Sequence, residues 1–109
     1  MPCDERLVER IRRLLKRRKG IAEKRMFGGV AFLAGGHMCC GVTGARLVLR
    51  LGNEGAAEAL AEPHTKEMDF TGRTLASMVY VEPRGTASEP QLRAWVERGL
   101  RHARSLPPR

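Results

Sequence analysis

The sequence lacks the features that mark several large classes of protein. No apolar run approaches the roughly 20 residues that a membrane-spanning helix needs, and the N-terminus is charged from Asp4 onward, unlike a secretory signal. The chain has three cysteines, two of them adjacent, so it has no even disulfide framework. We therefore expect a cytoplasmic protein in a reducing environment, with no membrane partner.

Motifs of common enzyme sites are also missing. The chain contains no C-x-x-C, no H-E-x-x-H and no serine elbow with histidine and aspartate partners. Its central acidic residues are scattered, as is typical of solvated helix and turn positions; they are Glu54, Glu58, Glu62, Glu67 and Asp69. The sequence therefore predicts a protein that is not an enzyme, with no catalytic residue, no bound metal and no cofactor.

One stretch, residues 25–42, raises the question of a ligand site because it reads RMFGGVAFLAGGHMCCGV. A phosphate-binding loop has glycines between a strand and a helix, followed by Gly-Lys-Ser/Thr, whereas Gly28 leads into an expected strand. Strand alternation places His37 and Cys39 on one face and Cys40 on the other, which gives two zinc ligands where a structural site needs four. We interpret the stretch as a structural hairpin with Cys40 as a small core residue.

Hydrophobic periodicity and turn residues predict the order α-β-β-β-α-β-β-α. The expected helices run from Asp4 to about Lys19, from a cap at Asn53 to just before Pro63, and onward from a capping box at Ser88 and Gln91. The expected strands are residues 30–33, 38–42, 46–51, 65–70 and 75–82. This order predicts one domain over residues 1–109, an α+β two-layer sandwich. Its antiparallel sheet has about five strands, with the helices on one face.

Apolar residues that recur at helical or strand spacing define a predicted core. They are Leu7, Ile11, Leu14, Phe32, Cys40, Leu47, Leu49, Val79, Val81, Leu92, Trp95 and Val96. On the other face of the sheet, Val48, Met78 and Tyr80 alternate with these core residues. An apolar patch usually marks an interaction surface, and a two-fold dimer is the commonest way to cover one. We therefore predict a homodimer joined through the open sheet face.

The net charge of +8 is concentrated in the two terminal segments. Residues 4–25 carry ten basic and four acidic side chains, and residues 88–109 carry five and two. On the first helix, one line of arginines lies away from the apolar residues: Arg6, Arg10, Arg13 and Arg17. Such a line can bind nucleic acid or an acidic partner. A solvated helix face in a protein rich in arginine explains the same pattern, so both interpretations stay open.

The run KRMFGGVAFLAGGHMCCGVTGARLVLRLG, followed by MDFTGR and MVYV, resembles the N-terminal domain of the bacterial TfoX/Sxy competence-regulator family. The shared pattern is a basic residue before Met-Phe-Gly-Gly, an apolar strand, a glycine turn and two further strands, and it covers nearly the whole chain. The resemblance implies the same α+β fold and no catalytic residue.

The resemblance also bears on function. It implies a non-enzymatic regulatory or adaptor module that contacts an unidentified protein, for which the transcription apparatus is a candidate. The alternative is a nucleic-acid-binding module that uses the two basic terminal helices. Family members usually carry a second, helical C-terminal domain, whereas this chain ends at Arg109. We therefore expect a stand-alone N-terminal domain.

Overall fold

The computed structural model describes residues 3–26, 28–70 and 72–107. Within them the chain forms the helices α1 (Glu5–Leu15), α2 (Gly52–Leu60) and α3 (Glu89–Ser105). The strands are β1 (Ile21–Met26), β2 (Gly29–Ala34), β3 (His37–Thr43), β4 (Arg46–Arg50), β5 (Thr65–Phe70) and β6 (Arg73–Val81), and a 3-10 turn, η1 (Pro83–Gly85), precedes α3. Phe27, from the Met-Phe-Gly-Gly run, lies outside the described residues.

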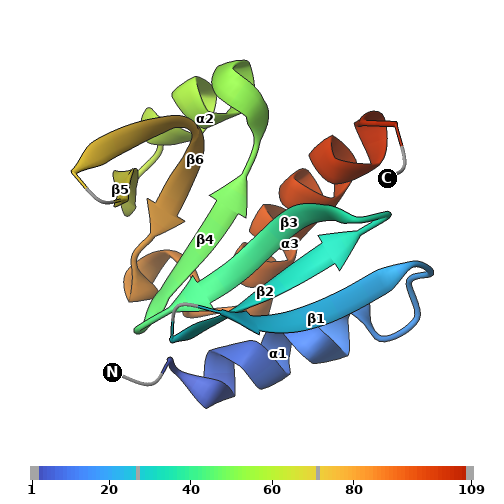
Figure 1. Cartoon of the computed structure of the whole chain (residues 1–109). Helices are drawn as coiled ribbons and strands as arrows, with labels where there is room; N and C mark the ends of the chain where they lie inside the picture. The colour runs from blue at the N-terminus through green and yellow to red at the C-terminus, as the bar shows by residue number, and fades with distance from the viewer. Residues whose placement is uncertain (1–2, 27, 71, 108–109) are drawn as a thin grey trace.

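The six strands form one antiparallel sheet in the order β1-β2-β3-β4-β6-β5. Helices α1 and α3 lie on the far side of the sheet in Figure 1, and α2 contributes to the same hydrophobic core. The predicted α+β fold, with helices on one face of an antiparallel sheet, is confirmed. No helix in the described ranges is long and apolar enough to cross a membrane.

Strand β1 was not predicted, and the first helix is shorter than expected. Helix α1 ends at Leu15 rather than near Lys19, and residues 21–26 form an edge strand, so the sheet has six strands instead of about five. Three charged residues fill the middle of β1, so it lacks the apolar alternation that identifies a strand. Helix α1 supplies partners for two of these charges, since Glu23 accepts two hydrogen bonds from Arg12 and Arg25 donates two to Glu5.

Two of the three helices have the cap residues that were predicted from the sequence. Asp4 caps α1 by accepting two backbone N–H groups of the first turn, and Ser88 and Gln91 form the predicted capping box of α3. The predicted cap at Asn53 is wrong, because α2 starts at Gly52 and has no side-chain cap. Only Leu51 lies between β4 and α2, so it occupies the N-cap position, and its apolar side chain cannot accept a hydrogen bond from the helix.

The predicted core is confirmed at every position except Leu14, which is half-buried against the core edge; the other predicted positions are at most 7% exposed. Close packing of α3 against the sheet depends on Gly99. A Cβ atom at this position would lie 2.3 Å from the carbonyl oxygen of Cys39 in β3. Helix α3 therefore rests directly on the backbone of a central strand.

A β-bulge in β3 changes which way the adjacent cysteines face. Phe32 pairs with Cys40, whereas the next residue, Leu33, pairs with Met38, so Cys39 is an extra residue in its strand. Cys39 and Cys40 are both fully buried in the core. The expectation that Cys40 faces away from Cys39 is therefore wrong, because the bulge resets the alternation. Its predicted role as a small core residue is confirmed.

Candidate functional site

The face of the sheet opposite the helices, called here the open face, carries a row of side chains that crosses all six strands. Residues paired across antiparallel strands point to the same face of a sheet. The row consists of Lys24, Ala31, Gly41, Val48, Tyr80 and Lys66. Its two end positions, on the edge strands, are lysines, and the positions between them are small, apolar or aromatic. The open face is thus apolar at its centre and basic at its edges.

A hollow of about 280 Å³ lies on the open face. Small residues, Ala31 and Gly41, occupy its centre. A Cβ atom on Gly41 would lie 2.6 Å from the carbonyl oxygen of Val30, so the backbone leaves no room for a side chain there. Larger side chains surround this floor; they are Met38, Val48, Met68, Leu75, Met78 and Tyr80. Three of them are methionines, whose flexible thioether chains adapt to the shape of a bound group.

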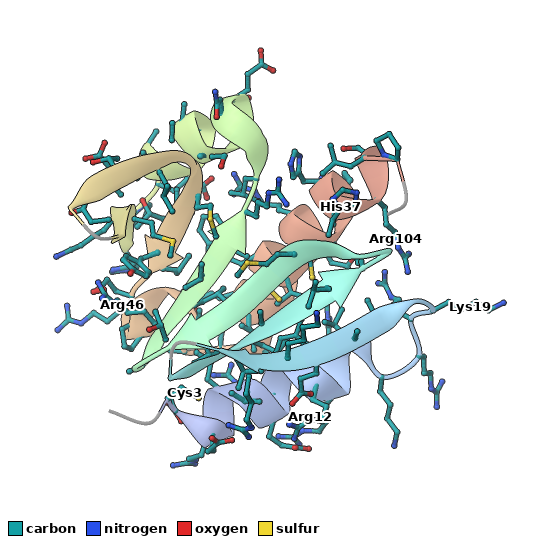
Figure 2. All side chains as sticks on the ribbon, viewed as in Figure 1. Cys3, Arg12, Lys19, His37, Arg46 and Arg104 are labelled. Carbon is teal, nitrogen blue, oxygen red and sulfur yellow. The ribbon has the colours of Figure 1, made fainter. Side chains whose placement is uncertain are left out.

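Basic residues surround this hollow. Arg46 lies over the Tyr80 ring, 3.8 Å from its centroid, and 3.9 Å from Glu82. Figure 2 shows Arg46 near one end of β4 and β6. Three more basic residues belong to the same face, namely Lys24 and Lys66 on the edge strands and Arg50 on β4. None of these three forms an ion pair with another described residue. They leave positive charge on both sides of an apolar hollow.

The four arginines predicted to bind nucleic acid or a partner lie on the helical side of the molecule. Arg6 and Arg13 are exposed on α1. Arg10 is half-buried and donates from Nε to Glu89 of α3 at 2.9 Å. Arg17 follows the end of α1, so the expected helical line stops at Arg13. The structure therefore does not place all four side chains along one helix.

Comparison with models of protein families matches residues 13–103 to the TfoX N-terminal domain. The chain belongs to the TfoX N-terminal domain family. The matched range contains the whole sheet, so the open face and its hollow lie inside the family domain. No curated protein and no solved structure matches the chain. The resemblance drawn from the Met-Phe-Gly-Gly run is confirmed.

In this TfoX N-terminal domain, two ion pairs between α1 and β1 neutralise charges on both elements. Hydrogen bonds from Arg12 hold the pKa of Glu23 below its ordinary value, and Arg25 lowers the pKa of Glu5 in the same way. Figure 2 shows Arg12 on the α1 side of the molecule. Pairs this exposed contribute little to stability, because water and salt screen the attraction between their charges. Their geometry explains the local balance of charge between α1 and β1.

The histidine and cysteines of residues 25–42 lie on the helix side of the sheet, away from the open-face hollow. The Nε2–H group of His37 donates a hydrogen bond to the carbonyl oxygen of Pro107, with an N···O distance of 2.5 Å. The Sγ atoms of Cys39 and Cys40 are 3.8 Å apart, and contact with Cys39 together with burial raises the pKa of the Cys40 thiol. The described residues contain no cluster of three metal-binding side chains. The predicted hairpin is present as the β2–β3 pair.

Proposed function

We propose that this protein is a non-enzymatic regulatory or adaptor module that acts through contacts with another protein. The observation that supports this function is the open-face hollow, where Met38, Met78 and Tyr80 are half-buried on a side of the sheet that no described helix covers. Concave apolar surfaces of this type are typical of binding sites. Family membership supports a competence-regulator-like module.

The three cysteines bear on the cellular compartment in which this contact forms. All three cysteines are free thiols, which supports action in the reducing cytoplasm. A partner in the transcription apparatus agrees with the regulator-like family. The test is capture of partners by the full chain from the native host, at low and high salt, with and without nuclease. A protein retained at high salt after nuclease treatment supports the function, and loss of every protein after nuclease treatment contradicts it.

Nucleic-acid binding is the second candidate function. It is favoured by the pairing of α1 with α3, because the Arg10–Glu89 contact brings two basic helices together as one surface. Replacing Arg10, Arg13 and Arg17 with Gln should lower DNA affinity and flatten its salt dependence by about 0.9 per lost phosphate contact. The control replaces Lys24 and Lys66 with Gln, which removes positive charge from the open face. Equal binding by the arginine variant and the unaltered protein would argue against this surface.

Homodimerisation through the open face, expected from the sequence, stays a prediction. Light scattering at micromolar concentration measures it directly. A mass near twice that of the 12.1 kDa chain supports the dimer. A mass near that of one chain leaves the open face available to a different protein.

A further inference from the structure

The open-face hollow is shaped to receive a projecting surface rather than a copy of itself. A two-fold interface brings the same patch of both copies together. Two hollows placed face to face would leave a void between them, because small residues such as Ala31 and Gly41 form each floor. Two copies would also bring Lys24 and Lys66 of one chain near the basic residues of the other, and like charges across an interface oppose association.

The backbone around the hollow restricts the conformation of its occupant. The hollow is lined mainly by residues of β2, β3, β4 and β6, and each of these strands already has hydrogen-bonded neighbours on both sides. A bound segment cannot add a strand there, so its backbone groups must find partners within the segment itself. An α-helix meets this requirement, and an amphipathic helix in an apolar groove is an established mode of peptide recognition.

The size and chemistry of the hollow identify the groups that fill it. A cavity of 150 Å³ is large enough for benzene, so about 280 Å³ accommodates roughly two ring-sized side chains. The methionine side chains around it accept aliphatic and aromatic anchors of varied shape. Two large apolar residues, separated by three or four positions on one helix, would enter together.

The basic residues at the edges of the open face indicate which side chains should flank the apolar anchors of the bound helix. Lys24 and Lys66 lie at opposite ends of the cross-strand row, and Arg50 lies on β4 between them. Carboxylates beside the apolar anchors would meet these groups, and such pairs raise association rates and choose among partners. We propose that the open-face hollow binds the apolar face of an acidic amphipathic helix in a partner protein. This inference rests on the proposed function, because it names the partner class for that function.

The test uses 15N-labelled full chain and a synthetic amphipathic peptide of about 18 residues, long enough to sample helix. The peptide carries Leu and Phe at helical spacing on one face and Glu on the other. A second peptide keeps the apolar residues and replaces every Glu with Lys. The acidic peptide is expected to shift the amide signals of Ala31, Gly41 and Val48, and the basic peptide to bind at least tenfold more weakly.

Two variants separate the hollow from general electrostatic attraction. The double variant Lys24→Glu/Lys66→Glu should weaken binding of the acidic peptide about tenfold. Its matched control, Arg93→Glu/Arg101→Glu, makes the same change in net charge at two exposed positions of α3 and should leave affinity within twofold. Met78→Gln keeps an unbranched side chain of similar length, and it should weaken binding without altering the salt dependence. The exposed lysine variant still provides the test if Met78→Gln folds poorly.

Several results would overturn the proposal. Equal weakening by the lysine and arginine double variants would show charge attraction without a site, and signal shifts confined to α1 or α3 would place binding elsewhere. Concentration-dependent shifts of Ala31 and Gly41 without peptide, together with a doubled mass, would assign the open face to a second copy. Capture of partners from the host separates failure of this inference from failure of the proposed function. If the Lys24→Glu/Lys66→Glu variant still captures a protein, that protein does not bind at the open-face hollow, and the adaptor function still stands.

Discussion

Replacing Gly99 with Ala should destabilise the protein, although the change improves intrinsic helix propensity. Gly99 lies inside α3, where Ala is favoured over Gly by about 1 kcal/mol when nothing else contacts the residue. In this structure the new Cβ would lie 2.3 Å from the Cys39 carbonyl oxygen and 3.4 Å from Cδ2 of Leu49. Ordinary contacts begin near 3.4 Å, so the helix or the strand must move by about 1 Å.

The size of this loss of stability depends on the atom that the new Cβ would meet, which is the Cys39 carbonyl oxygen. Overpacking a core typically costs about 1–3 kcal/mol, and the obstruction here is backbone of a central strand, which has no alternative rotamer. We take a packing cost of about 3 kcal/mol or slightly more, because the backbone cannot move aside easily. Subtracting the propensity gain of about 1 kcal/mol leaves a net loss of stability of about 2 kcal/mol. For a domain of this size the melting temperature should fall by roughly 10 °C.

Urea and thermal unfolding, followed by circular dichroism, measure this difference. The matched control is Ala94→Gly at an exposed position of the same helix, which should cost about 1 kcal/mol through propensity alone. If Gly99→Ala raised stability by the amount that Ala94→Gly lowers it, α3 would not rest on the β3 backbone. The packing described for Gly99 would then be refuted.

Two further perturbations test the core and the surface charges. Leu49→Ala removes a fully buried side chain and should cost about 2–5 kcal/mol in urea unfolding; a loss below about half a kcal/mol would mean that β4 presents its other face to the core. Glu23→Gln tests the ion pair with Arg12 through pH. Because the folded-state pKa of Glu23 is lowered, its stabilisation is present above the ordinary value of 4.5 and disappears as the pH falls through the folded-state pKa. The variant should therefore be slightly less stable than the unaltered protein at pH 7, and the difference should shrink as the pH falls below 4.5; a difference independent of pH would contradict the pairing.

The sequence alone determined the features that depend on neighbouring residues. The apolar spacing of α1, the Asp4 cap and the capping box at Ser88 are local patterns, and each predicted its element correctly. Alternation in the strands after residue 29 likewise identified the buried face of the sheet, because one face packs against helices. These local agreements explain why the α+β class and most of the core could be predicted.

Only the tertiary structure decided features that depend on a distant partner. Strand β1 is held by β2 and by ion pairs to α1, so its charged sequence gave no strand signal. The bulge that buries both Cys39 and Cys40 is a mismatch in register between two strands, and register is a property of the pair. The candidate site has the same origin. Val48 and Tyr80 could be assigned to the open face from alternation, but the hollow required Gly41 to be placed beside them by strand pairing. Arg10 pairs with Glu89, which lies 79 positions away in the sequence and near it only in the folded chain.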